Sequence, residues 1–123
     1  MKLDHVAIAV NDLDSAVESY RKLLGIEPKI EVDEERGLKI AVFQLENARI
    51  ELMTPIREDT AISKFLKKRG NGLHHIALKV DKIEKYLDDF PPITPIERGI
   101  TASRVVFLDL DATHRVLIEL VED

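Results

Sequence analysis

The pattern of residues 3–10 alternates as in a half-buried strand, and three further strands are predicted near 28–33, 38–45 and 48–54. Between the first two, apolar residues recur at helical spacing over 13–24. Asn11–Asp14 supply N-cap chemistry at the start of this helix, and Gly25 follows as a C-terminal stop. Glu46–Asn47 would form the turn between the last two strands.

The second half shows a similar succession of patterns. Strands are predicted over 73–80, 93–98, 103–110 and 115–121, with a short helix over about 81–89. Pro91, Pro92 and Pro95 end that helix and confine the strand near 93–98 to a sheet edge. Residues 60–69 read as a helix that links the two halves.

The two halves also repeat in sequence. Residues 5–13 read HVAIAVNDL and residues 75–83 read HIALKVDKI, an offset of 70. Ile50-Glu51-Leu52 matches Ile118-Glu119-Leu120 at an offset of 68. Two separate matches at nearly the same sequence offset indicate a duplicated βαβββ module. The predicted fold is therefore α+β, with two paired βαβββ modules whose histidines and glutamates can converge.

We expect one domain over 1–123, because the chain is too short for two ordinary domains. Its first module spans about 1–56, the linker helix about 60–69 and the second module about 72–123. A homodimer is expected, since such sheets leave exposed edges.

The two repeated histidines lie on the strand face that small residues occupy. His5 lies on the face of Ala7, and His75 on the face of Ala77, while the branched apolar residues between them point to the face that a helix would cover. Glu51 and Glu119 likewise point away from their apolar neighbours. We predict that the His/Ala face is left uncovered by helices.

Two imidazoles and two carboxylates form a mixed nitrogen and oxygen set that suits a divalent first-row metal ion. Four protein ligands would leave two positions of an octahedral ion open for water or substrate. The alternative is that each residue alone is an ordinary core or surface side chain, and only the repeat favours the metal site. His74 points away from His75 and is interpreted as structural, and His114 as a solvated turn residue.

Composition excludes several classes of protein. The 123 residues contain 18 Lys and Arg against 23 Asp and Glu, and a net charge of -5 argues against nucleic-acid binding. The absence of cysteine excludes disulfides, thiolate nucleophiles and thiolate metal sites. No apolar run approaches the length of about 20 residues that spans a membrane, and no signal-peptide pattern is present, so a cytoplasmic protein without a membrane partner is expected.

The sequence resembles the vicinal oxygen chelate superfamily (glyoxalase, bleomycin resistance and dioxygenase proteins), and within it looks most like the methylmalonyl-CoA epimerases. The matching stretches are LDHVAIAV at 3–10, RIELMTP at 49–55, ISKFLKKRG at 62–70, GLHHIA at 72–77 and VLIEL at 116–120. The resemblance implies a glyoxalase-like curved mixed sheet around one divalent metal ion (Co, Mn, Ni or Zn), with ligands His5, Glu51, His75 and Glu119.

The activity that this resemblance implies is inversion of the α-carbon of methylmalonyl-CoA, an acyl-CoA thioester, through a metal-stabilised enolate. Glu119 is the candidate acid/base residue. The epimerases carry a glycine-rich loop and a His-Pro-Lys-Ser stretch where this chain has 97–103 and 109–113, so the substrate-binding residues are unknown. Some epimerases use a second glutamate near the position of Lys39–Ile40, where this chain has no carboxylate.

Two other functions stay open at this point. A glyoxalase I-like lyase or isomerase acting on a thiol adduct would share all four ligands. A non-catalytic small-molecule binding protein of the same scaffold usually lacks them, and a ring-cleaving dioxygenase is generally a much longer chain.

Overall fold

The computed structural model describes residues 1–100 and 102–123. The elements follow in the order β1 (Lys2–Ala9), α1 (Leu13–Leu24), β2 (Lys29–Asp33), β3 (Leu38–Gln44), β4 (Arg49–Pro55), α2 (Ala61–Arg69), β5 (Gly72–Lys79), the 3₁₀ turn η1 (Ile83–Tyr86), β6 (Arg104–Phe107) and β7 (Ile118–Glu122). In the described part of the chain, no helix has both the length and the apolar character needed to cross a membrane.

The chain forms two compact units. Val6–His74 make up one, called here the α1 unit, and Met1–His5 with His75–Asp123 make up the other, called the η1 unit. Strands β1 and β5 each contribute residues to both units.

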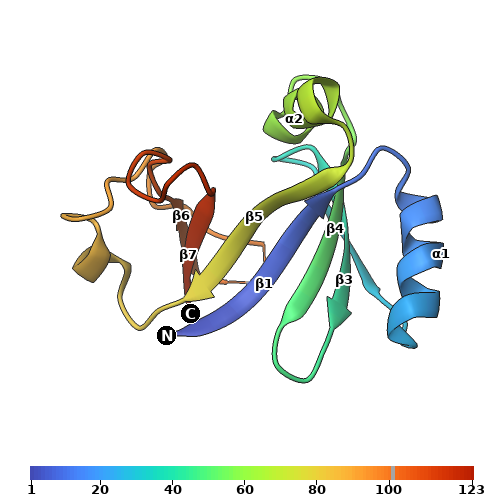
Figure 1. The fold of residues 1–123 in the computed structure, drawn as a ribbon, viewed down its shortest axis with the longest axis horizontal. Helices are drawn as coiled ribbons and strands as arrows, with labels where there is room; N and C mark the ends of the chain where they lie inside the picture. Colours follow the sequence, from blue (N-terminus) through green and yellow to red (C-terminus); the bar gives the residue numbers. More distant parts are fainter. Residues whose placement is uncertain (101) are drawn as a thin grey trace. The chain divides into compact units, whose positions relative to one another are not determined.

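In the α1 unit the strands are neighbours in the order β2-β3-β4-β1, and α1 covers one face of them (Figure 1). The helix begins where the Asp12 side chain accepts a hydrogen bond from the backbone N–H of Ser15. It ends at Gly25, whose φ of 71° is a left-handed conformation that glycine adopts without a steric penalty. Val17 of the helix packs in a core with Phe43 and Leu52.

Helix α2 packs on the opposite face of the same strands. Ile62 and Leu66 share a core with Ala7, Ile40 and Met53. The helix is capped at its start by Thr60, whose side chain accepts a hydrogen bond from the Ser63 N–H at 3.0 Å. The prediction that the His/Ala face stays free of helices is therefore wrong for its Ala7 end, where small side chains let a helix approach closely.

In the η1 unit the strand order is β1-β5-β7-β6, with β5 and β7 parallel and β6 and β7 antiparallel. The sheet is therefore mixed, as predicted. Its core is formed by apolar side chains of the strands and of η1: Val80, Ile83, Val106, Leu108 and Leu120.

The two modules repeat the same strand neighbours, as the sequence repeat predicts. In the first, β1 lies next to β4 and β4 next to β3, and in the second β5 lies next to β7 and β7 next to β6. The N–H of Val10 donates to the carbonyl of Met53 at 2.9 Å, and the N–H of Val80 donates to that of Val121, also at 2.9 Å. These donors are 70 residues apart and the acceptors 68, which are the offsets of the sequence repeat.

The second module departs from the prediction at two elements. The helix expected over 81–89 is only the single 3₁₀ turn Ile83–Tyr86. The strand expected near 93–98 is reduced to isolated bridges, one between Pro92 and Leu108 and one between Glu97 and Val105. Proline lacks the N–H that a ladder or a helix interior requires, so the proline-rich segment forms neither element.

Candidate metal centre

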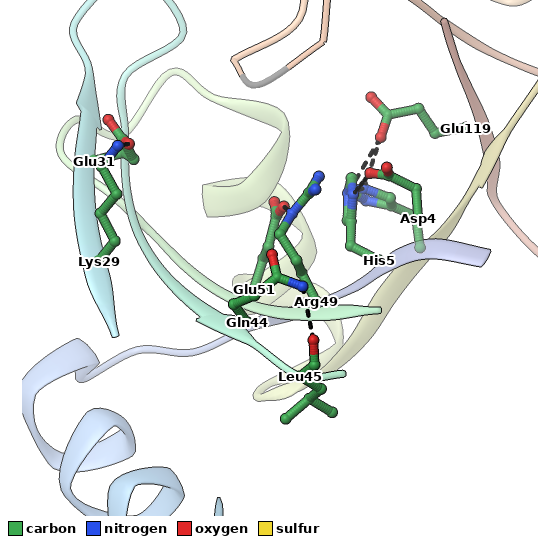
Figure 2. A network of polar contacts seen from close by, with 10 residues as sticks. Asp4, His5, Lys29, Glu31, Gln44, Leu45, Arg49, Glu51 and Glu119 are labelled. Atoms are coloured by element: carbon green, nitrogen blue, oxygen red, sulfur yellow. Dashed lines mark hydrogen bonds and ion pairs between the residues drawn. The ribbon is translucent and has the colours of Figure 1, made fainter. Parts of the chain in front are cut away.

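Three of the four predicted ligands meet inside the η1 unit. His5 extends from β1, His75 from β5 and Glu119 from β7, and all three are buried. Nε2 of His5 lies 3.3 Å from Nε2 of His75 and 3.3 Å from Oε1 of Glu119. The same Oε1 lies 3.4 Å from Nε2 of His75, and Figure 2 shows the contact between His5 and Glu119. The three ligand atoms form a nearly equilateral triangle.

Strand register explains how Glu119 and His75 come to share this place. Glu119 is the register partner of Ala77 on β5 and of Phe107 on β6. His75 lies two residues before Ala77 and so faces the same side of the strand. The small side chain of Ala77 leaves room for both groups. The ring of Phe107 packs edge-on against the imidazole of His75 with centroids 5.1 Å apart, which restricts the orientation of that imidazole.

Asp4 orients the other imidazole. Nδ1 of His5 donates a hydrogen bond to Oδ2 of Asp4 at 2.7 Å, so Nε2 is the nitrogen directed at Glu119 and His75. Metal-binding histidines commonly have such a carboxylate partner. The sequence interpretation missed this role, because the position of Asp4 in the repeat is occupied in the second module by His74. The available signal was an acidic residue directly beside a candidate ligand.

The electrostatics of Glu119 reflect its two neighbours. Burial by itself raises the pKa of the Glu119 carboxyl, but hydrogen bonds with His5 and His75 and their charge outweigh burial and lower that pKa to about 2. The group is therefore a carboxylate at neutral pH, as a metal ligand must be.

The geometry of the three groups fits a divalent metal ion. Ligands at about 2.1 Å from one ion lie about 3.0 Å apart in octahedral and about 3.4 Å apart in tetrahedral geometry. The edges of the triangle are 3.3, 3.3 and 3.4 Å. The Nε2 atoms of His5 and His75 are also within hydrogen-bond distance of each other, with one ring donating its N–H and the other accepting. A two-histidine, one-carboxylate set leaves further positions of an ion open to other ligands.

Glu51, the fourth predicted ligand, belongs to the α1 unit. It is buried on β4, where it is the register partner of Val42 on β3. Nε of Arg49, two residues earlier on the same strand face, lies 3.4 Å from Oε2 of Glu51 (Figure 2). The cation beside this carboxylate offsets part of the cost of burying it.

The two adjacent histidines of β5 have separate surroundings, as predicted from the period of two. His75 belongs to the triangle, whereas the ring of His74 packs edge-on against Phe65 of α2 with centroids 5.0 Å apart. His114 is exposed in a turn, with a φ of 56°. Both side chains have the structural and solvated roles that the sequence indicated.

Comparison with known proteins identifies the family. Residues 4–102 match the model of the glyoxalase/bleomycin resistance protein/dioxygenase superfamily. The mitochondrial methylmalonyl-CoA epimerase of Dictyostelium discoideum is 34% identical, and the match covers 98% of this chain and 78% of that protein.

Two solved structures are similar over nearly the whole chain. The methylmalonyl-CoA epimerase of Mycobacterium tuberculosis is 37% identical with a TM-score of 0.87, covering 98% of this chain and 87% of that one. A methylmalonyl-CoA epimerase in complex with methylmalonyl-CoA and NH4+ is 34% identical with a TM-score of 0.88, covering 99% and 94%. By its sequence match and its likeness to these structures, the chain belongs to the glyoxalase/bleomycin resistance protein/dioxygenase superfamily.

Proposed function

We propose that the chain is a divalent-metal-dependent isomerase that epimerises methylmalonyl-CoA, with His5, Glu51, His75 and Glu119 as the metal ligands. The observation that carries the proposal is the triangle of His5, His75 and Glu119, in a chain 34% identical to an epimerase solved with methylmalonyl-CoA. The inclusion of Glu51 is supported by the repeat, since Glu51 is the counterpart of Glu119 at an offset of 68.

The reaction requires removal of a proton from the carbon next to a thioester carbonyl and its return on the opposite side. A bound divalent ion would supply a Lewis acid for the negative charge that develops on the substrate oxygens. Asp4 holds the imidazole of His5 in one orientation, and Phe107 limits rotation of His75. The carboxylate of Glu119 is the candidate group for one of the two proton transfers.

The test combines metal analysis with isotope exchange. Purified protein is loaded in turn with Co²⁺, Mn²⁺, Ni²⁺ or Zn²⁺, and its metal content is measured. NMR of methylmalonyl-CoA in D₂O then follows loss of the α-proton signal against an enzyme-free control, with His75→Ala as the matched variant. We expect metal-dependent exchange in the wild type only. Metal-loaded wild type that exchanges no faster than the enzyme-free control would contradict the proposal, and an assay with a glutathione hemithioacetal would then test the glyoxalase-like alternative.

The assembly and location of the protein are separate proposals. We infer a homodimer, which sedimentation equilibrium would reveal as twice the mass of the chain. A cytoplasmic location also stays a prediction, and fractionation of the source cells tests it.

A further inference from the structure

Strand β2 forms an open edge of the α1 unit. It is the terminal strand of the order β2-β3-β4-β1, and its neighbour in the sheet is β3. The outer side of a terminal strand carries a row of N–H and C=O groups to which another strand can be added. The partner of this edge can be identified from the backbone groups and the side chains that the edge presents.

The hydrogen bonds of β3 show which residues of β2 direct their backbone groups outward. The N–H of Ile56 donates to the carbonyl of Gly37 at 2.8 Å, in the register of β3 with β4. Because successive residues of an antiparallel strand bond to opposite sides, odd-numbered residues of β3 bond to β4 and even-numbered ones to β2. Their partners on β2 are its odd-numbered residues, such as Glu31. Ile30 and Val32 therefore present their N–H and C=O groups at the outer edge.

The side chains of β2 give this edge an apolar side and a charged side. Ile30 is the register partner of Ala41, which lies in the core that α1 covers. Ile30 and Val32 on that face are nevertheless 47% and 53% exposed. Lys29 and Glu31 point to the other face, where the Lys29 ammonium nitrogen lies 3.2 Å from Oε1 of Glu31 (Figure 2). A neighbouring strand would bury the two branched side chains and meet the two charges.

The terminal strand of the η1 unit, β6, is covered instead. Segment 91–97 runs along it, with one bridge between Pro92 and Leu108 and another between Glu97 and Val105. Proline in this segment has no N–H to offer a further strand. In the described part of the chain, no strand or isolated bridge is paired with the outer edge of β2.

Resting on the homodimer inferred above, we propose that two copies of the chain pair along β2, antiparallel about a two-fold axis at Ile30. The two Ile30 residues then exchange both backbone hydrogen bonds, since each directs its N–H and C=O outward. Lys29 faces Glu31 of the partner subunit, and the symmetry repeats this pair on the other side of the axis. The N–H of Val32 reaches the carbonyl of Pro28 of the partner subunit, a bond that needs no N–H from proline.

The charges on β2 favour this register over its neighbours. An axis at Lys29 would set the two Lys29 ammonium groups opposite one another, and an axis at Glu31 would do the same with the two Glu31 carboxylates. Like charges directly opposite destabilise a strand pair, and unlike charges stabilise it. An axis between two residues would oppose outward-facing backbone groups to inward-facing ones. Only the axis at Ile30 gives both Lys29 and Glu31 an opposite charge.

The ends of the paired strands carry charges that are already balanced within each chain. In this register Glu27 faces Asp33 of the partner subunit. The guanidinium of Arg21 lies 2.5 Å from Oε2 of Glu27, and that of Arg36 lies 2.9 Å from Oδ2 of Asp33. Each carboxylate therefore brings its own cation to the interface.

Exchange of charges on β2 tests the pairing, with the dimer dissociation constant measured by sedimentation equilibrium. Lys29→Glu sets a carboxylate opposite Glu31 of the partner subunit, and Glu31→Lys sets an ammonium group opposite Lys29 of the partner subunit. Each change should raise the dissociation constant at least about 10-fold, since two favourable pairs become two unfavourable ones. The double variant, and an equimolar mixture of the two single variants, should restore the wild-type value because unlike charges again face each other.

Lys22→Glu on α1 is the matched control. Its side chain is 77% exposed, and the same change of charge there should leave the dissociation constant as in the wild type. The pairing is overturned if either single variant dimerises like the wild type, if the double variant and the mixture stay dissociated, or if Lys22→Glu weakens the dimer equally. A wild type that is monomeric at every concentration would instead refute the homodimer itself.

Discussion

A single hydrogen bond to Asp4 orients His5, one of the proposed metal ligands. The 2.7 Å contact from Nδ1 of His5 to Asp4 selects the nitrogen that faces His75 and Glu119. Asp4→Asn should therefore keep the fold and weaken divalent-metal affinity by about 10–100-fold, the usual effect of losing such a partner. Calorimetric titration with Co²⁺ measures it, with Asp88→Asn, an exposed aspartate, as the control. An Asp4→Asn variant that binds Co²⁺ like the wild type would remove Asp4 from the site.

His74 and His75 give a second prediction at this scale. His75→Ala should abolish tight metal binding and activity while leaving a folded domain, because it removes one corner of the triangle. His74→Ala should keep the metal and lose about 1 kcal/mol of unfolding free energy, the worth of the edge-on ring contact with Phe65. Metal titration and urea unfolding of both variants decide between the two residues. The reverse pattern would mean that the site is assigned to the wrong face of β5.

At the scale of elements, a charged network anchors the 3₁₀ turn that replaces the expected second-module helix. Arg104 on β6 contacts both Glu84 of η1 and Glu122 of β7, with 2.9 Å between Nη1 of Arg104 and Oε2 of Glu122. Oε1 of Glu122 also accepts a hydrogen bond from the N–H of Ile83 at 2.9 Å. The network therefore holds η1 against the two strands where Ile83 enters the core.

This network predicts a pH dependence of stability. Hydrogen bonds from Arg104 lower the pKa of the Glu84 carboxyl from 4.5 to about 2. Because the folded-state pKa is depressed, the stabilisation is present above pH 4.5 and is lost as the pH falls through about 2. Glu84→Gln should thus show a shallower loss of stability than wild type between pH 4.5 and 2 in urea unfolding. Glu58→Gln, at an exposed site, serves as the control, and identical pH profiles for wild type and Glu84→Gln would contradict the role of the pair.

At the scale of the whole molecule, metal binding should couple distant parts of the chain. The triangle joins residues from near the N-terminus, the middle and near the C-terminus of the sequence: His5, His75 and Glu119. A ligand that binds only the folded state at 100 times its Kd stabilises it by about 2.7 kcal/mol. We expect Co²⁺ to raise the unfolding midpoint of the wild type in proportion to the logarithm of its free concentration. His75→Ala should show no such shift, and an equal shift in that variant would place the bound ion elsewhere.

Features that depend on local periodicity and on the repeat could be predicted from the order of the amino acids. Alternation separates His75 from His74, and the two offsets single out His5, Glu51, His75 and Glu119. It also located the capped helix α1 and the linking helix α2, because caps and helical spacing are local properties.

Features that depend on pairing between distant segments follow instead from the three-dimensional fold. The register of β2 with β3 brings Glu31 beside Ile40, and the register of β7 with β5 and β6 brings Glu119 beside Ala77 and Phe107. Neither follows from the period of two, because alternation fixes the face of a residue but not its neighbour on the next strand. Helix α2 covers Ile40 because the two pack in one core. The turn η1 is shorter than the predicted helix because of the prolines that follow it. In both cases these effects outweighed the local pattern of the segment.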